Sequence, residues 1–502
     1  MEKKTIILFH PLIENQYYKC IPYAVLYLER VVRDVDVNLI IIDENVEKNY
    51  ENIVLNIKEN LLFVGISSII GSQIIGGIRF ARFIKSLNPQ NIVLWGGWHS
   101  TILPEQTLKE DYIDFVITGQ GENAFRAFTM AMLNAQINWN NIPNLSYKDN
   151  GRLVINQSEP FCDFNSFPPV NYDLVDINNY IYHPEYAKKA IVYFASHGCP
   201  YNCNFCAMAT YFKQKWIPRN IDTIINDLKY FKEKAGIDSV FFQDDNFFTQ
   251  KKFCVGLCEA LIQSGMGLLW ETWSHAGGFL KMFNDDDVDV LYKAGCRQII
   301  CGSESGSQKV LDMVNKKLKV EDNIQFVKLL KKHKIIPFFS IMLCFPDNTV
   351  DELDETFEMI RKAKLIDNKL KVYFSYYTPY PGTKMFQYAQ EKSFKMPENL
   401  KDWSEHTFDD FHAPWWTENY ESKLEMFAHF YIPLSNPVNY KNFYRPPFIK
   451  FCLYLINKIF YPIVILRFKA NWFKCPIEAK LFLFLLKSFN KLFKKNYKLY
   501  PF

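Results

Sequence analysis

Short apolar runs alternate with amphipathic helical stretches along most of this chain, and this alternation constrains the fold more than any other feature. Residues 1–140 contain five runs typical of β-strands, at 5–10, 37–43, 61–67, 91–97 and 114–119. Residues 73–85 and 122–133 have the spacing of amphipathic helices. Strands that alternate with helices in this way predict a Rossmann-like, doubly wound α/β domain with a parallel sheet.

The carboxyl ends of these strands are the expected ligand edge of that sheet, because ligands bind there in open α/β folds. The candidate binding residues at this edge are mostly small: Ser67, Gly96, Gly97, Gly119, Gly121 and Glu122. Small residues allow a bulky ligand to approach the backbone closely. A nicotinamide dinucleotide is not expected, because no G-x-G-x-x-G sequence follows the first strand.

Residues 189–385 form a second series of alternating elements. Strands are predicted at 190–195, 238–243, 267–274, 298–303, 337–345 and 371–378. Helices are predicted at 221–234, 253–263, 285–294, 321–333 and 351–364. Six βα units predict a partial TIM barrel with its chemistry at the carboxyl ends of the strands. Between the two series, residues 141–188 lack sustained periodicity and are interpreted as a linker.

A cysteine-rich loop follows the first strand of the second series. Its cysteines, Cys199, Cys203 and Cys206, have the spacing C-x3-C-x2-C. Three thiolates from one short loop suit a [4Fe–4S] cluster whose fourth iron stays open for chemistry. A structural zinc site is an alternative, but zinc needs a fourth ligand and His197 lies too close in sequence. Three buried cysteines without a metal are a further alternative.

The composition limits the class of protein and the cellular compartment in which this loop is expected. With 49% hydrophobic and 22% charged residues, the chain is globular rather than disordered or collagen-like. Its 12 cysteines in 502 residues do not suggest a disulfide scaffold, and three of them crowd into one loop. This usage favours a metal site in a reducing cytoplasm. No signal peptide is expected, because Glu14 and Asn15 follow only a short apolar run.

The cysteine loop, with Phe205 before its last cysteine, resembles that of the radical S-adenosylmethionine superfamily. The resemblance implies that Cys199, Cys203 and Cys206 bind the cluster and that its open iron binds S-adenosylmethionine. One electron then cleaves this cofactor to a 5′-deoxyadenosyl radical, which abstracts a hydrogen from the substrate. The backbone near Phe205 is expected to meet the adenine.

Further segments at the strand ends resemble the same superfamily. Asp244, after the second strand, is implied to contact the methionine amino group, although it also suits a helix N-cap. Glu304 lies in a sequence similar to G-x-E-S-G-S and is implied to lie near the ribose or the amino group; a plain turn is the alternative. Residues 379–383 resemble a P-x-P-G-T turn, whereas Phe345-Pro346-Asp347 departs from G-F-P-G-E.

The N-terminal domain resembles the cobalamin-binding subfamily, and the likeness to that subfamily extends over about residues 1–385. The matching stretches are 64–67, 95–105 and 118–122. The D-x-H-x-x-G sequence that supplies a histidine to cobalt is missing, and His10 and His99 have no such context. The resemblance therefore implies cobalamin without a histidine lower ligand. A degenerate module kept for packing or for another ligand is the alternative.

These features together predict a cobalamin-dependent radical enzyme that methylates an unactivated carbon of a small molecule. The resemblance also implies an external electron donor such as flavodoxin or ferredoxin. Radical cyclisation or rearrangement is the alternative reaction, because the same architecture supports it. An alternative of another class is a non-catalytic iron–sulfur or zinc sensor.

The C-terminal region, residues 386–502, ends in a basic tail that is expected to be mostly helical. Residues 440–502 hold thirteen Lys and Arg and one acid, a net charge of +12, so the rest of the chain carries −8. Residues 448–466 are nearly long enough to span a bilayer, but lysines and Pro462 interrupt them. Residues 477–493 have the pattern of an interfacial basic amphipathic helix.

Two interpretations of this tail stay open. It makes peripheral contact with the inner face of a membrane, which would suit a lipid-soluble substrate, or its helices pack on the body of the protein. Nucleic acid is not expected as a partner, because the body is acidic and holds no recognised nucleic-acid module.

Overall fold

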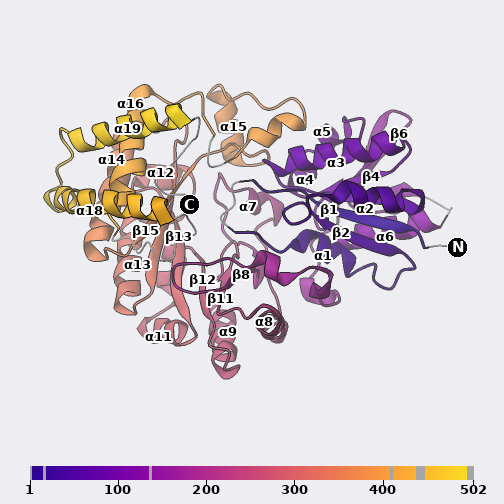
Figure 1. The fold of residues 1–502 in the computed structure, drawn as a ribbon, viewed down its shortest axis with the longest axis horizontal. Helices are drawn as coiled ribbons and strands as arrows, with labels where there is room; N and C mark the ends of the chain where they lie inside the picture. Colours follow the sequence, from indigo (N-terminus) through magenta and orange to yellow (C-terminus); the bar gives the residue numbers. More distant parts are fainter. Residues whose placement is uncertain (1–2, 15–17, 135–137, 408–410, 437–446, 494–502) are drawn as a thin grey trace.

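The computed structural model describes residues 3–14, 18–134, 138–407, 411–436 and 447–493, without the side chains of 447–453 and 489–493. Two sheets lie side by side, with the N-terminal domain beside the barrel (Figure 1). The prediction of a doubly wound domain followed by a partial barrel is confirmed.

The N-terminal sheet has seven strands in the order β2-β1-β3-β4-β5-β6-β7, and its first five strands are parallel. They are β1 Thr5–His10, β2 Asn38–Asp43, β3 Leu61–Ser67, β4 Val93–Gly96 and β5 Phe115–Ile117. The strand order reverses between β1 and β3, so their carboxyl ends form the switch point at which ligands bind in such sheets.

Helices cover both faces of this sheet, because alternate strand residues are apolar on both sides. One face packs on α2 Tyr50–Ile57, α3 Gln73–Leu87 and α5 Pro104–Leu108, and the other on α1 Tyr23–Glu29 and α6 Glu122–Leu133. The short helices of this half are η1 Lys58–Asn60, α4 Trp98–Ile102 and η2 Trp139–Asn141.

The segment 141–188 holds more regular structure than the expected linker. Strands β6 Leu145–Asp149 and β7 Arg152–Ile155 form a hairpin that pairs antiparallel with β5 and extends the sheet. Asn150 and Gly151 have φ of 48° and 80°, the conformation of a tight hairpin turn. The linker interpretation is therefore wrong for this hairpin, whose short β7 lacks an apolar alternation. The rest holds η3 Phe164–Ser166, η4 Tyr172–Leu174 and η5 Ile177–Tyr180.

The second sheet is an open half-barrel of six parallel strands in the order β15-β14-β13-β12-β11-β8. Its strands are β8 Ala190–Tyr193, β11 Ser239–Phe242, β12 Leu269–Ser274, β13 Cys296–Glu304, β14 Ile336–Leu343 and β15 Lys371–Tyr376. The helices of this half are α8 Ile221–Ala235, α9 Lys251–Gln263, α10 Ala276–Met282, α11 Asp285–Lys293, α12 Gln308–Met313, α13 Val320–Lys332, α14 Val350–Ile366 and α15 Lys384–Glu391.

The first loop of the N-terminal domain reaches into the half-barrel. Tyr18 follows β1 in the chain, yet its ring lies 5.2 Å from that of Tyr182 and 5.7 Å from that of Phe241. These residues join Val192 and Ile300 in one core cluster inside the barrel. The two halves therefore share part of their interior.

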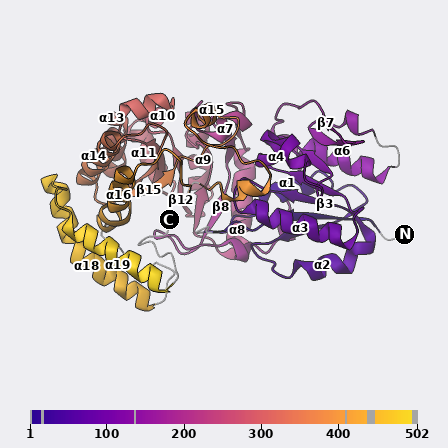
Figure 2. The same ribbon diagram turned by 90° about the horizontal axis from the view of Figure 1, so that it is seen from above.

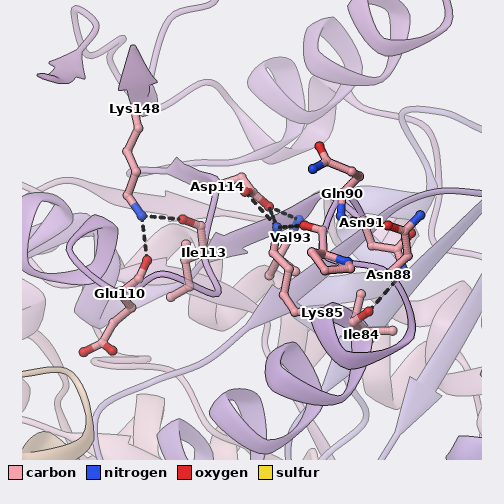
Figure 3. A network of polar contacts seen from close by, with 11 residues as sticks. Ile84, Lys85, Asn88, Gln90, Asn91, Val93, Glu110, Ile113, Asp114 and Lys148 are labelled. Atoms are coloured by element: carbon pink, nitrogen blue, oxygen red, sulfur yellow. Dashed lines mark hydrogen bonds and ion pairs between the residues drawn. The ribbon is translucent and has the colours of Figure 1, made fainter. Parts of the chain in front are cut away.

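A polar network fixes the amino edge of the N-terminal sheet, opposite its ligand edge (Figure 3). Asp114 accepts a hydrogen bond from the backbone N–H of Val93 at 2.8 Å and pairs with Lys85 at 2.8 Å. Lys148 donates to the carbonyl oxygens of Glu110 and Ile113. This network ties helix α3 and strand β6 to the beginnings of β4 and β5.

The C-terminal region returns to both halves of the molecule. Its elements are η6 Lys401–Glu405, α16 Glu418–Met426, η7 Phe427–Tyr431, α17 Ile432–Leu434, α18 Pro447–Ala470 and α19 Ile477–Phe493. Trp403 is fully buried and donates a hydrogen bond to Gln106 of the N-terminal domain at 2.7 Å. Among the residues described, no helix has the length and apolar character needed to cross a membrane.

Candidate active site

The cysteine loop lies at the carboxyl end of β8, between β9 Ser196–Gly198 and α7 Ala207–Tyr211. Strand β9 pairs antiparallel with β10 Trp216–Pro218, which fixes the start of the loop. Gly198 has φ of 82°, and a Cβ there would lie 2.2 Å from the carbonyl oxygen of Lys215. Only glycine fits this position, so the ribbon depends on it.

A turn after α12 is fastened to the cysteine loop by three hydrogen bonds. Asn204 donates from its backbone to Val314 at 2.9 Å and from its side chain to Met313 at 2.8 Å. Asn315 donates in return to the carbonyl oxygen of Asn202 at 2.6 Å. Sequence reasoning missed this strap, because its partners lie more than 100 residues apart and form no motif.

The three cysteines occupy a largely enclosed position. Burial raises the pKa of Cys199 to about 12, that of Cys206 to about 11, and also that of Cys203. Thiolates in such surroundings need a positive partner, which iron supplies when it binds. Three sulfur donors on one loop therefore fit a cluster.

The three thiolates would each bind a different iron of a cluster, so they do not have to converge on one point. Among the residues described, no group of three His, Cys, Asp or Glu side chains is placed to hold one metal ion.

Lys316 brings a buried positive charge to the cysteine loop. Its Nζ lies 2.6 Å from Oε1 of Glu304 and 5.9 Å from the ring centroid of Phe205. Burial alone would lower the pKa of Lys316, but the charges of Glu304 and Cys203 outweigh it and raise that pKa. A Cβ on Gly302 would lie 2.7 Å from both charged groups, so this glycine makes room for the pair. Lys316 could not be predicted as a site residue from the sequence, since its position depends on the strap.

Asp244 is buried, and both of its carboxylate oxygens are occupied by groups of the protein. It is 1% exposed, and it accepts hydrogen bonds from the backbone of Ala195 at 2.9 Å and from the Ser196 hydroxyl at 2.5 Å. Burial raises its pKa to about 7. Its neighbour Asp245 is exposed and accepts a hydrogen bond from the backbone of Gly198 at 2.8 Å.

The predicted glycines at the edge of the N-terminal sheet differ in what surrounds them. Gly97 has φ of 107°, and a Cβ there would lie 2.1 Å from the carbonyl oxygen of Ser68. A Cβ on Gly96 would meet nothing nearer than 3.7 Å, and one on Gly119 nothing within 4 Å. Gly97 is therefore needed for packing of the chain itself, whereas Gly96 and Gly119 leave space.

The other residues predicted at this edge, Ser67, Gly121 and Glu122, lie close to these glycines. Ser67 is half-buried and pairs in register with Gly96. Gly121 is the N-cap residue of α6, and Glu122 next to it forms a buried ion pair with Arg30 at 2.7 Å. The carboxylate of Glu122 is thus occupied by a partner within the protein.

Neither histidine of the N-terminal domain is presented as an open ligand. His99 is fully buried, with its ring 5.6 Å from that of Trp403. His10 ends β1 at the switch point, and its Nε2 lies 3.3 Å from Nε2 of Gln73. Burial lowers the pKa of both imidazoles.

The ligand edges of the two sheets meet. Tyr211 of α7, directly after the cysteine loop, donates a hydrogen bond to the carbonyl oxygen of Gly119 at 2.9 Å. The ring of Trp98 at the end of β4 lies 4.9 Å from that of Tyr380, which follows β15. Groups bound at the two edges would therefore be neighbours.

Two family models match the chain in the order of its two sheets. The model of the B12 binding domain matches residues 10–129, and that of the radical SAM superfamily matches residues 193–360. Together they match more than half of the chain.

Relatives and solved structures agree with these matches. An uncharacterized methyltransferase of Pyrococcus horikoshii is 29% identical over 326 residues, which cover 64% of this chain and 68% of that protein. An anaerobic magnesium-protoporphyrin IX monomethyl ester cyclase of Rubrivivax gelatinosus is 26% identical over 319 residues, covering 62% of this chain and 56% of the cyclase. The match thus spans little more than half of the cyclase.

The fold is shared with OxsB, a cobalamin-dependent S-adenosylmethionine radical enzyme whose structure was solved with aqua-cobalamin and S-adenosylmethionine. The TM-score is 0.73 at 16% identity, over 100% of this chain and 77% of OxsB. TsrM of Kitasatospora setae, a radical S-adenosylmethionine methyltransferase, gives 0.61 at 14% identity, over 78% of this chain and 75% of TsrM.

The half-barrel with its cysteine loop is thus a radical S-adenosylmethionine domain, which implies a [4Fe–4S] cluster and S-adenosylmethionine. The chain belongs to the members of this superfamily that carry an N-terminal B12-binding domain, which implies cobalamin.

Proposed function

We propose that the protein methylates an unactivated carbon of a small molecule. The observation that carries this proposal is the contact between the two ligand edges through Tyr211 and Gly119. When bound, the cluster with S-adenosylmethionine supplies a 5′-deoxyadenosyl radical, and cobalamin supplies a methyl group. The residues of the barrel edge would hold the radical source beside the carbon to be methylated, and those of the N-terminal edge would hold the methyl donor next to it.

The residues of the barrel edge have separate roles in this proposal. Cys199, Cys203 and Cys206 hold the cluster, and the backbone near Phe205 meets the adenine. Lys316, paired with Glu304, presents positive charge to the cluster and to the carboxylate of S-adenosylmethionine.

The second strand end has two carboxylates with different surroundings. Asp244 holds the end of β8 in place, because its oxygens are occupied by Ala195 and Ser196. The exposed Asp245 is better placed than Asp244 for the contact with the methionine amino group.

At the N-terminal edge, Ser67, Gly96 and Gly119 would line the corrin. Gly97 and Gly121 shape the loops beneath it, and Glu122 holds α6 through Arg30. The domain would hold cobalamin without a histidine ligand to cobalt, since the ring of His99 packs against that of Trp403 and His10 contacts Gln73.

Radical cyclisation is the second candidate function. Two similar proteins, from Rubrivivax gelatinosus and from Synechocystis, are anaerobic magnesium-protoporphyrin IX monomethyl ester cyclases. The proposed substrate is a lipid-soluble small molecule such as an isoprenoid, a hopanoid or a porphyrin. The proposed electron donor is an external flavodoxin or ferredoxin. The cysteines that the structure describes are all free, which suits a reducing compartment.

The decisive experiment is anaerobic reconstitution of the full chain with iron, sulfide and hydroxocobalamin, followed by product analysis under a low-potential reductant. We expect both 5′-deoxyadenosine and S-adenosylhomocysteine, and loss of 5′-deoxyadenosine in Cys203→Ala. Formation of 5′-deoxyadenosine without S-adenosylhomocysteine would favour the cyclase. Neither product, or zinc in the cysteine loop, would favour the sensor instead.

A further inference from the structure

Helices α18 and α19 form an antiparallel hairpin at the end of the molecule farthest from the N-terminus (Figures 1 and 2). Both helices pack inward on the same residue of η7, Phe430. The rings of Phe460 and Phe482 each lie 5.3 Å from it. Val464 and Ala479 on the same inner side are fully buried. The hairpin thus has one face against the body and one face outside.

The outer face of the hairpin is apolar. At about 100° per residue, its exposed side chains lie opposite the inner ones on both helices. Each is between 39% and 73% exposed: Leu455, Ile459, Ile463, Leu466, Ile477, Leu481, Phe484 and Leu485. Large apolar side chains gathered on one exposed face in this way indicate an interaction site.

Lysines border this apolar strip on both sides. The ion pair between Arg467 and Glu478 lies where the helices face each other. Exposed lysines occupy the side of each helix turned away from that pair: Lys458, Lys469 and Lys480. Lys487, also exposed, is paired with Glu425 of α16 at 2.7 Å. Glu478 is the single acid between residues 454 and 488, and it is already paired. The free charge of the hairpin is therefore positive.

We propose that this outer face binds the surface of an anionic lipid bilayer, with both helices in the plane of the interface. An apolar face bordered by lysines is the pattern of helices that lie at the boundary of headgroups and acyl chains. Trp472 in the connecting turn is 53% exposed, and tryptophan is favoured at the level of the headgroups. A protein partner is less favoured, because lysine is depleted at protein interfaces.

The test is flotation of the full chain with vesicles of phosphatidylcholine, with and without phosphatidylglycerol, at low and high salt. We expect binding to the anionic vesicles that weakens in high salt. Lys458→Gln with Lys480→Gln should lower the partition about 30-fold, since each lysine near an anionic surface contributes to binding. Leu466→Ser with Phe484→Ser should lower it as well. Ile262→Ser, an exposed residue of α9, is the matched control and should bind like the unchanged chain.

Three results would overturn the proposal. One is absence of binding to anionic vesicles at low salt by a chain whose circular dichroism and melting are normal. Another is binding that survives both double substitutions. The third is an unchanged chain that is a dimer without lipid and a Leu466→Ser, Phe484→Ser variant that is a monomer but floats with vesicles as before. That result would show that the face binds a second copy of the chain. None of these measurements requires cofactors or turnover, so they are independent of the proposed reaction.

Discussion

Lys316 is the residue whose contribution the sequence concealed most completely. Its ammonium group is held by Glu304 at 2.6 Å and lies beside the cysteine loop. A lone lysine in the run Asn315-Lys316-Lys317 is unremarkable until the turn is docked on Asn202 and Asn204. The three cysteines, by contrast, were recognisable because all of them come from one loop.

Replacement of Lys316 should therefore change the cluster. Lys316→Met is expected to lower the reduction potential of the cluster by on the order of 100 mV, because a nearby positive charge favours the reduced form. A redox titration followed by electron paramagnetic resonance measures this shift. Lys316→Arg should restore most of it, and Lys317→Met, at an exposed neighbour, should show none. An unchanged potential in Lys316→Met would contradict the assigned position.

Gly96 and Gly97 provide a matched pair of substitutions at the other edge. Gly97→Ala should destabilise the chain by about 1–3 kcal/mol or more, because φ is strained and the Cβ meets the backbone of Ser68. Gly96→Ala should keep the unfolding free energy but weaken cobalamin binding if the corrin lies there. Denaturant unfolding and equilibrium dialysis with hydroxocobalamin distinguish the two. Equal stability of both variants would contradict the packing described for Gly97.

The titration of Asp244 should be visible in stability. Burial raises its pKa from an ordinary value of 3.8 to about 7, so the folded chain holds this proton more tightly than the unfolded chain. The resulting stabilisation is complete below pH 4 and is lost as the pH rises through 7. Asp244→Asn should therefore be less pH-sensitive than the unchanged chain in melts at pH 5 and pH 8. Parallel curves for the two chains would show that Asp244 has an ordinary pKa.

Among the elements, those with strong apolar periodicity were predictable and those defined by long-range partners were not. All eleven strands expected in the two series are present within a few residues of their expected bounds. The hairpin β6–β7 and the ribbon β9–β10 were missed, because β7 has only four residues, three of them exposed, and β9 and β10 have three residues each, which is too short to show a pattern. Apolar periodicity in the sequence predicts elements that bury one face, whereas these short strands are stabilised by hydrogen bonds to neighbouring strands.

The amino edge of the N-terminal sheet should affect stability alone. Asp114→Asn removes the ion pair with Lys85 and weakens the bond to Val93, so we expect a loss of about 1–3 kcal/mol. Iron, sulfide and cobalamin content of the reconstituted protein should stay unchanged, because the ligand edge is opposite. Asp111→Asn, at an exposed position nearby, is the control. Loss of cobalamin binding in Asp114→Asn at normal stability would contradict the conclusion that this edge affects stability and not ligand binding.

At the scale of the molecule, Trp403 joins the C-terminal region to the N-terminal domain. It is fully buried, contacts His99 and donates to Gln106 at 2.7 Å. Trp403→Ala should destabilise the protein by about 3–5 kcal/mol and separate the melting of the two halves. Differential scanning calorimetry detects such a split. Trp472→Ala, at an exposed tryptophan, should leave the melting profile unchanged, and a single transition in Trp403→Ala would argue against this coupling.

The position of Tyr18 has a consequence for how this protein is made. The ribosome delivers the loop after β1 long before β8 and β11 exist, yet its tyrosine ends between Tyr182 and Phe241. The first domain can acquire its sheet early but must wait for most of the chain before that aromatic ring finds its final neighbours. Exchange of the N-terminal half between homologous proteins should accordingly require the matching barrel interior to travel with it.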